Sequence, residues 1–261
     1  MKLSIVICAY NERKTILDAI HQAHALDLGS GWDKEIVVVD NCSTDGTREL
    51  LQGVDLPGVR VIYHPHNLGK SGSLKTGITE ASGDYFVIFD ADLEYEANDI
   101  PRMVAQISPP PTPPASGGGA PSGRNASSLT AASGVGVDGG TIAVYGSRTL
   151  GGRKIYEYAK NYWGVRFLSV VTNLFYGSQL SDVAVGLKLA RLDVTRSLNL
   201  ETTIGFDLEF EMTFKLLKRG HDILEVATAY HPRTVAEGKK LKAFSTGFRV
   251  LWLIVKMRFW E

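Results

Sequence analysis

Short apolar runs alternate with helical patterns through the first hundred residues. Four runs rich in β-branched and aromatic side chains are typical of buried strands, and they cover residues 5–8, 36–39, 59–63 and 85–89. Amphipathic helical patterns at about 13–26, 44–52 and 70–82 separate these runs. The alternation predicts an α/β fold with a mostly parallel central sheet and helices on both faces.

The second half of the chain continues with both kinds of pattern. We expect strands at 141–145 and 185–190, a pair of strands within 222–230, and helices at about 153–177 and 206–218. Apolar side chains at three-to-four spacing follow in residues 241–260, which predicts an amphipathic C-terminal helix.

Residues 108–140 interrupt the pattern, because they are rich in Pro, Gly and Ser and contain almost no large apolar side chains. Such a segment cannot bury enough surface to offset its ordering entropy, so we expect a disordered insertion. We interpret it as a linker insertion, with a lid over the site as the alternative. The chain is therefore expected to form one domain over 1–240, with halves at 1–107 and 141–240, followed by the helix at 241–261.

Composition narrows the class of protein. The formal net charge is zero, so nothing global argues for a nucleic-acid partner, although Lys and Arg outnumber Glu from 233 to 261. Two cysteines, Cys8 and Cys42, do not make a disulfide framework and favour a reducing, cytoplasmic location. No run approaches the roughly 20 apolar residues of a membrane span.

Polar side chains stand where the predicted strands end. Asp90 and Asp92 directly follow the run 85–89, and hard cations such as Mg²⁺ and Mn²⁺ take carboxylate and phosphate oxygens as ligands. In open parallel sheets, ligands bind at the carboxyl ends of the strands. The sequence therefore predicts a metal site for a diphosphate at this edge.

Two further segments combine turn chemistry with possible binding. Residues 40–47 follow a buried strand and open a helix, so capping alone explains them, although the carboxylate of Asp40 is also suited to accept from a nucleotide base. Lys70 lies in a Gly-rich turn into a helix, a setting that attracts phosphate. The spacing of a P-loop is missing there.

Four motifs in order resemble the inverting family-two glycosyltransferases of GT-A fold. They are Ile7-Cys8-Ala9-Tyr10-Asn11-Glu12, the segment from Val39-Asp40-Asn41 to Gly46-Thr47, Asn67-Leu68-Gly69-Lys70, and Asp90-Ala91-Asp92-Leu93-Glu94. One position departs from the pattern, because Asn41 stands where many relatives have a second Asp.

The second half is similar to the polyprenyl-phosphate glycosyltransferases, which include the dolichol-phosphate mannose synthases. The resemblance rests on Gly146-Ser147-Arg148, Ser181-Asp182, Val185-Gly186-Leu187-Lys188, Glu209-Phe210-Glu211 and the segment from Tyr230 to Lys240. It covers nearly everything outside 108–140.

The resemblance implies transfer of a sugar from a UDP- or GDP-sugar with inversion at the anomeric carbon. It makes 1–107 the nucleotide-sugar-binding half and 141–240 the acceptor half. The implied nucleotide-sugar-binding residues are Ala9, Tyr10, Asn11, Glu12, Asp40, Asn41, Ser43, Asp45, Lys70, Asp90 and Ala91. The implied ligands of the Mg²⁺ or Mn²⁺ cofactor are Asp90, Asp92 and Glu94.

The implied acceptor is a polyprenyl phosphate lipid. Its implied contacts are Arg148, Arg166, Asp182, Arg233 and Lys239, and the implied catalytic residues are Asp92, Asp182 and Arg148. A lipid phosphate is already anionic and needs positioning rather than a strong base, whereas a hydroxyl acceptor would require Asp182 as the general base.

Three alternatives stay open from the sequence. The first is a soluble glycosyltransferase acting on a hydroxyl acceptor in polysaccharide or cell-envelope synthesis. The others are a nucleotidyltransferase, although no Gly-rich signature loop with basic residues follows the first strand, and a non-catalytic nucleotide-binding module. We expect the protein to lie at the inner face of the cytoplasmic membrane, held by its basic amphipathic helix or by a separate membrane-anchored partner.

Overall fold

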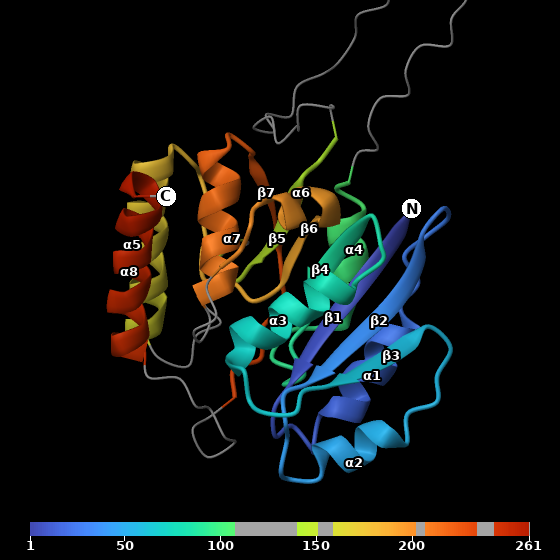
Figure 1. The fold of residues 1–261 in the computed structure, drawn as a ribbon. Helices are drawn as coiled ribbons and strands as arrows, with labels where there is room; N and C mark the ends of the chain where they lie inside the picture. Colours follow the sequence, from blue (N-terminus) through green and yellow to red (C-terminus); the bar gives the residue numbers. More distant parts are fainter. Residues whose placement is uncertain (108–139, 151–158, 202–206, 234–242, 261) are drawn as a thin grey trace, which may run out of the picture.

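A mixed sheet forms the centre of the computed structural model, which describes residues 1–107, 140–150, 159–201, 207–233 and 243–260 (Figure 1). The strands are β1 (Lys2–Ala9), β2 (Asp33–Asp40), β3 (Val59–Tyr63), β4 (Tyr85–Ile88), β5 (Ala143–Ser147), β6 (Lys188–Arg191) and β7 (Ile223–Ala227). The helices are α1 (Ile16–Ala25), α2 (Thr47–Gln52), α3 (Gly69–Glu80), η1 (Ala97–Asp99), α4 (Ile100–Val104), α5 (Ala159–Tyr176), α6 (Leu192–Ser197), α7 (Asp207–Lys218) and α8 (Ala243–Phe259).

The strand order in the sheet is β3-β2-β1-β4-β6-β5-β7. Strands β1 to β4 are parallel, with β1 between β2 and β4. Strand β6 runs antiparallel to both β4 and β5, and β5 is parallel to β7. The carboxyl ends of β1, β2, β4, β5 and β7 therefore lie at the same edge of the sheet.

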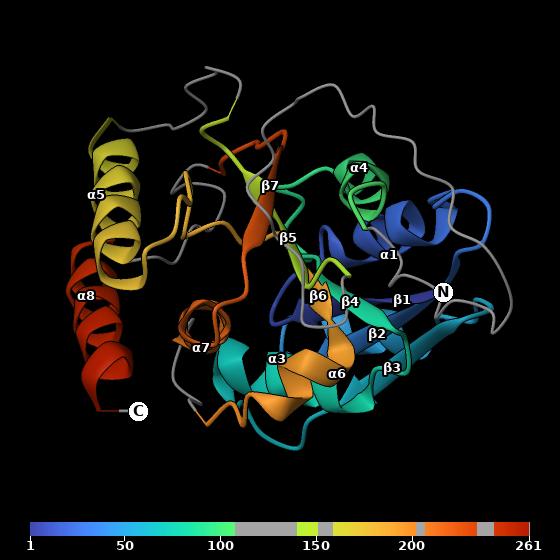
Figure 2. The same cartoon turned by 90° about the horizontal axis from the view of Figure 1, so that it is seen from above.

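Helices cover both faces of this sheet. Figure 2 shows α1 and α4 on one face, and α3, α6 and α7 on the other. Helices α5 and α8 lie side by side beyond α7, at the end of the molecule away from β3, in both views. No helix within the described part of the chain is long and apolar enough to cross a bilayer.

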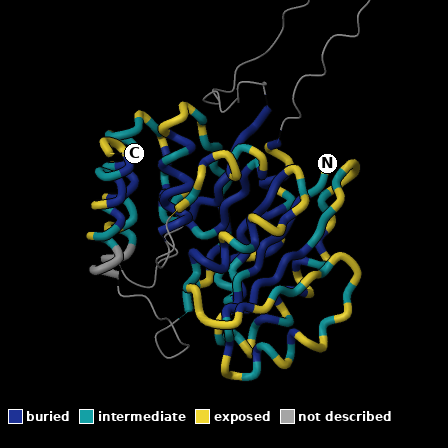
Figure 3. Tube along the Cα trace, viewed as in Figure 1, coloured by how far each residue is buried: buried dark blue, intermediate teal, exposed yellow. Residues whose placement is uncertain are grey.

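Two apolar clusters hold these layers together, and Figure 3 shows the buried residues along the strands and on the inner sides of the helices. The larger cluster surrounds the sheet, where all four residues of β4 are buried because helices cover both of its faces. The smaller one joins α5, α7 and α8 through Leu168, Phe214 and Ile254. Helix α8 thus packs by one side on α5 and α7.

Most expected elements are present, and the expected α/β class with a mostly parallel sheet is confirmed. The expectation of two strands within 222–230 is wrong, because this segment contains β7 alone and then a single bridge between Tyr230 and Tyr95. The expected strand at 185–190 begins only at Lys188, since residues before it form a loop. The expected disordered insertion at 108–140 stays a prediction, because residues 108–139 lie outside the described part of the structure.

Candidate active site

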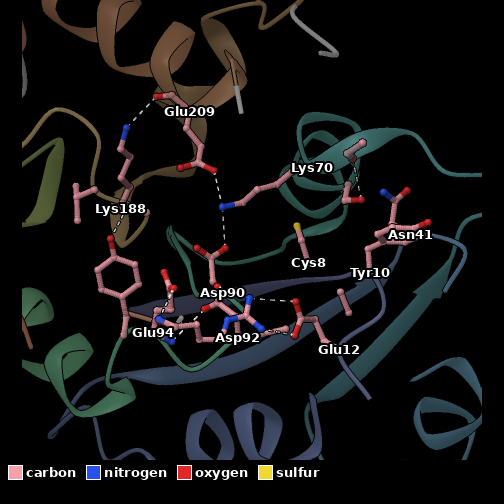
Figure 4. A pocket seen from close by; sticks show the side chains of 18 of the residues that line it. Cys8, Tyr10, Glu12, Asn41, Lys70, Asp90, Asp92, Glu94, Lys188 and Glu209 are labelled. Carbon is pink, nitrogen blue, oxygen red and sulfur yellow. Dashed lines mark hydrogen bonds and ion pairs between the residues drawn. The ribbon is translucent and has the colours of Figure 1, made fainter. Parts of the chain in front are cut away.

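A pocket of about 460 Å³ opens where the carboxyl ends of the strands meet. Figure 4 shows charged side chains of its lining, and the labelled ones follow β1 and β4 or come from α3, β6 and α7. The expected site residues that line it are Ala9, Tyr10, Glu12, Asn41, Lys70, Asp90, Ala91, Asp92, Glu94, Arg148 and Arg233. The structure therefore brings together residues that are more than 200 positions apart in the sequence.

Backbone strain marks the three strand ends at this pocket. Asn11, Cys42 and Leu93 have positive φ angles of 56°, 62° and 58°, and they follow β1, β2 and β4. Residues other than glycine rarely adopt positive φ angles. Such angles cost about 1 kcal/mol or more per residue and are found preferentially at functional sites. Three such residues at one edge indicate that the turns are shaped for binding.

Hydrogen bonds between the loops after β1 and β2 hold that shape. The backbone N–H of Asn11 donates to Ser43 Oγ at 3.0 Å, and the N–H of Thr44 donates to Asn11 Oδ1 at 2.8 Å. Asp45 accepts from the N–H of Thr47 and of Arg13, and its pKa is lowered by these bonds against an opposing effect of burial. Asn11, Ser43 and Asp45 shape the loops here without lining the pocket.

The end of β2 contributes one scaffold residue and one pocket residue. Asp40 is fully buried and accepts from Arg48 Nε at 2.6 Å, so its carboxylate is engaged away from the pocket. Asn41 lines the pocket, accepts from the N–H of Leu68 at 2.8 Å and donates to Asn67 at 2.9 Å. An amide, with both a donor and an acceptor, can bridge these loops in a way that a second Asp cannot.

Lys70 connects α3 to both halves of the fold. Its Nζ lies 2.8 Å from Asp90 Oδ1 and 2.8 Å from Glu209 Oε1 on α7, as Figure 4 shows. The pKa of Lys70 is raised well above its usual value, because the two carboxylates outweigh the effect of burial. Asp90 fits closely against the loop before β6, where a Cβ at Gly186 would come within 2.8 Å of Asp90 Oδ2.

Asp92 lies in an acidic environment that contains one opposing cation. Burial and the charges of Asp90 and Glu94 raise its pKa to about 6, while Arg233 acts in the other direction. Arg233 Nη2 donates to Asp92 Oδ2 at 3.0 Å, and Arg233 Nη1 donates to Glu12 Oε2 at 3.0 Å. The carboxylate thus has a high affinity for positive charge.

The residues present are compatible with a divalent cation at Asp90 and Asp92. Among the described residues, no group of three or more His, Cys, Asp or Glu converges as a complete metal site. Glu94 is directed elsewhere, since its oxygens accept from Tyr230 OH at 2.7 Å and from the N–H of Arg233 at 2.9 Å. Two carboxylates that repel each other nevertheless suit Mg²⁺, which usually takes its remaining ligands from water and substrate phosphates.

Arg148 is held at the pocket wall by Asp182. Its Nε and Nη2 donate to the two oxygens of Asp182 at 2.7 and 2.8 Å, and its guanidinium lies over the ring of Tyr230. Asp182 is fully buried and does not line the pocket. This bidentate geometry favours a positioning role for Asp182 over the role of general base.

The two other expected acceptor contacts are placed differently. Arg166 on α5 donates to the backbone carbonyl of Ser181 at 3.3 Å, beside Asp182 and outside the pocket lining. Lys239 lies outside the described residues.

Several pocket residues were not expected as site residues from the sequence. Among them are Cys8, Tyr95, Lys188, Glu209 and Tyr230. Glu209 and Glu211 are two positions apart on α7, and they do face different surroundings: Glu209 contacts Lys70, whereas Glu211 contacts Lys215 at 2.7 Å. The helical period gives this separation, but it does not reveal which of the two faces the pocket.

Known proteins resemble this chain in part of its sequence and in its fold. Residues 4–116 match the family model described as glycosyl transferase family 2. The dolichol-phosphate mannosyltransferase of Pyrococcus furiosus is 38% identical over 109 residues, which are 41% of this chain and 30% of that protein. An undecaprenyl-phosphate 4-deoxy-4-formamido-L-arabinose transferase of Pseudomonas fluorescens is 35% identical over 108 residues, or 40% of this chain and 32% of that protein.

A third relative has a different kind of name. The succinoglycan biosynthesis protein ExoO of Rhizobium meliloti is 35% identical over 102 residues, which are 39% of this chain and 28% of that protein. The matched segments thus span only about a third of these curated relatives.

Solved structures extend the likeness to nearly the whole chain. Glucosyl-3-phosphoglycerate synthase from Mycobacterium tuberculosis, in complex with Mn²⁺, UDP and phosphoglyceric acid, gives a TM-score of 0.65 at 20% identity. The match covers 99% of this chain and 78% of that chain. The same enzyme with Mg²⁺ and UDP gives 0.61 at 21% identity, covering 98% and 79%. At this identity the likeness shows the GT-A fold.

Proposed function

Because residues 4–116 match the family model described as glycosyl transferase family 2, we propose that this chain transfers a sugar from a nucleoside diphosphate sugar to polyprenyl phosphate, with inversion at the anomeric carbon. The observation that carries the proposal is that one pocket is lined both by Asp90 and Asp92, which follow β4, and by Arg148, which follows β5. The first suits a metal-bound diphosphate and the second suits an anionic acceptor.

The donor would occupy the side of the pocket formed by β1 and β2. Ala9, Tyr10 and Glu12 line this side together with Asn41, and Tyr10 is 39% exposed, so its ring is accessible to a nucleotide. Asn11, Asp40, Ser43 and Asp45 would act from behind, by fixing the two loops. Uridine and guanosine donors are both compatible with this arrangement.

Asp90 and Asp92 would hold Mg²⁺ or Mn²⁺ against the diphosphate. The bound cation would neutralise the charge that develops on the leaving nucleoside diphosphate. Lys70 contacts Asp90 and Arg233 contacts Asp92, so both carboxylates have cationic neighbours. These contacts support the site as one built for positive charge.

The acceptor phosphate would be positioned by Arg148, with Arg166, Arg233 and Lys239 as further cations. Arginine binds phosphate through a planar fork of N–H donors. Asp182 uses both its oxygens on Arg148 and thereby orients the guanidinium towards the pocket. An acceptor that is already anionic needs no proton removed, which is consistent with a fully buried Asp182.

A hydroxyl acceptor is the second candidate. It is favoured by the relative that is named for succinoglycan biosynthesis and by the neighbour crystallised with phosphoglyceric acid. A hydroxyl acceptor would need a general base near the reacting carbon. Asp182 could serve only after release from Arg148, so the geometry supports this function less well.

An exposed apolar surface supports a place at the membrane. We define the α5–α8 apolar surface by its eight exposed side chains on or next to α5 and α8, each 57% to 80% exposed: Trp163, Phe167, Val170, Leu174, Phe248, Trp252, Phe259 and Trp260. Large exposed apolar patches mark sites of interaction with proteins or membranes. Lys256 and Arg258 on α8 add the positive charge that favours an anionic leaflet.

We propose that this surface lies on the inner face of the cytoplasmic membrane, where a polyprenyl phosphate would be within reach. The opposite side of α8 packs on the domain through Val250, Ile254 and Met257. The helix therefore has one apolar side for the fold and a second for an external partner. A separate membrane-anchored protein is the alternative occupant.

Thermal unfolding with candidate donors tests the donor half of this function. A ligand that binds only the folded state raises the melting temperature. We expect a UDP-sugar or a GDP-sugar to raise it in the presence of Mn²⁺ and to have little effect in EDTA. The variant Asp92→Asn should lose the metal-dependent shift, whereas Asp193→Asn, an exposed carboxylate on α6, should keep it. No shift with either donor class would contradict the proposal.

A further inference from the structure

Arg233 links three acidic residues of the pocket. Its guanidinium donates from Nη1 to Glu12 at 3.0 Å and from Nη2 to Asp92 at 3.0 Å, with a longer contact of 3.3 Å from Nη2 to Glu12. Its backbone N–H donates to Glu94 at 2.9 Å. The residue follows β7, so the second half of the chain supplies a cation to the first.

These bonds occupy the oxygen that a metal ion would need. Asp92 Oδ2 is already in contact with the guanidinium. A divalent cation at the same oxygen would lie next to the positive charge of Arg233 and would be repelled by it at a few ångströms. Metal binding and the present position of Arg233 therefore compete.

The guanidinium of Arg233 also has one N–H group without a hydrogen-bond acceptor in the described structure. Arg233 Nε is buried and has no hydrogen-bond acceptor among the described residues. A buried N–H without an acceptor is unfavourable, and arginine presents its N–H groups in a fork that matches a phosphate. A phosphate beside Arg233 would offer Nε the acceptor that Glu12 and Asp92 do not provide.

Lys70 is held differently and does not compete in the same way. Its ammonium is shared between Asp90 and Glu209 at 2.8 Å each. If Asp90 turns to a metal ion, Lys70 keeps the carboxylate of Glu209. Arg233 would keep its contact with Glu12, but it would lose Asp92 while its Nε already lacks an acceptor.

We propose that Arg233 is a resident counter-ion for Asp92, that a metal ion displaces it from this carboxylate, and that the freed N–H groups then bind phosphate while Glu12 keeps its contact. The inference rests on the proposed metal-dependent donor binding and deepens it. Free metal has to break the contact between Arg233 and Asp92, with only Glu12 left as a carboxylate partner, and therefore binds weakly. Metal with a nucleoside diphosphate supplies Arg233 with a new anionic partner, so the two bind cooperatively.

Mn²⁺ binding without any nucleotide tests this exchange, with free Mn²⁺ measured by electron paramagnetic resonance. The variants are Arg233→Gln, Arg233→Lys and the control Arg102→Gln, which removes an arginine paired with Asp99 outside the pocket. Removing the competing charge should tighten Mn²⁺ binding by about tenfold in Arg233→Gln, equivalent to about 1.4 kcal/mol. Arg233→Lys should lie between it and the wild type, and Arg102→Gln should match the wild type.

Repeating the titration with UDP or GDP separates the possible failures. The wild type should bind Mn²⁺ much more tightly with nucleotide, and Arg233→Gln should gain less. A structural role alone would not raise metal affinity, so equal or weaker Mn²⁺ binding by both Arg233 variants overturns the exchange. If the wild type binds no Mn²⁺ even with either nucleotide, the metal-dependent function itself is wrong, and the exchange with it.

Discussion

At the scale of single residues, Lys188 connects the pocket to α7 in an apolar setting. Its Nζ donates to the carbonyl of Glu209 at 3.1 Å and to Thr213 Oγ1 at 3.0 Å, and it lies near the rings of Tyr145 and Phe210. Desolvation lowers its pKa to about 8, against the favourable charges of Glu209 and Asp182. Lys188 thus fixes the helix turn that aims Glu209 at Lys70.

This setting predicts a pH-dependent contribution of Lys188 to stability. Below about pH 8 the lysine is charged in both the folded and unfolded states, so its contribution is constant. Between about pH 8 and its usual pKa of 10.5, only the unfolded state holds the proton. The free energy of unfolding should therefore rise with pH there, by at most about 1.4 kcal/mol per pH unit.

Urea unfolding at pH 7.5, 8.5 and 9.5 measures the effect by comparison with Lys188→Met, which cannot titrate. The free-energy difference between wild type and variant should shift in favour of the wild type as the pH rises. Lys75→Met, which removes an exposed lysine of α3, is the matched control. A difference that stays constant across these pH values would show that Lys188 keeps its proton.

Sequence reasoning identified the site residues that stand in local motifs and missed those that tertiary structure supplies. Asp90, Asp92 and Glu12 directly follow apolar runs, so their place at the strand ends was predictable. Lys188 ends a motif of the second half and Tyr95 follows Glu94, but neither was expected as a site residue. Their contact with the pocket depends on β6 lying beside β4, which no short-range signal specifies.

At the scale of elements, α5 and α8 form a pair with two different sides. The pair is joined by Tyr176 OH donating to the carbonyl of Ile254 at 3.0 Å and by Arg258 Nε donating to the carbonyl of Phe175 at 2.9 Å. The amphipathic pattern of residues 241–260 predicted the helix. It did not predict that α5 would extend the exposed apolar side. Nothing in the sequence around Trp163 and Phe167 indicates that α5 packs beside α8.

Liposome flotation tests whether the α5–α8 apolar surface binds membranes. The variant Phe167→Ser, Phe248→Ser, Trp252→Ser removes exposed side chains from both helices. Each loss should cost on the order of 1 kcal/mol of apolar burial, so binding to anionic vesicles should fall by at least about tenfold. Tyr63→Ser, an exposed aromatic on β3, is the control.

Neutral vesicles should bind the wild type less well, because Lys256 and Arg258 would lack anionic lipid partners. Equal recovery of the wild type and the triple variant from both vesicle types would remove the membrane role of this surface. It would favour a separate protein partner at α5 and α8.

Several short elements and element ends could not be predicted from the sequence. The short helices at 97–104 and 192–197 were not expected, since one or two turns give too few residues for a periodic signal. Two strands were expected within 222–230, but β7 ends at Ala227 and Tyr230 forms only a single bridge to Tyr95.

At the scale of the whole molecule, one sheet carries both halves of the proposed reaction. The parallel strands of the first half were predictable from alternating apolar runs and helices. The direction of β6 was not, because an apolar run does not specify which way a strand runs. That antiparallel strand places β5 parallel to β4, so Arg148 and Asp90 reach the same edge.

Detection of the transferred sugar tests the central proposal most directly. The chain is incubated with labelled UDP- and GDP-sugars, Mn²⁺ and vesicles containing polyprenyl phosphate, beside a parallel reaction with soluble glycosides. We expect label to enter the lipid phase, to stop in EDTA, and to appear at least about a hundredfold more slowly with Asp92→Asn. Asp193→Asn should match the wild type. Label that passes only to soluble hydroxyl acceptors, or that stays on the nucleotide with every donor, would contradict transfer to a lipid phosphate.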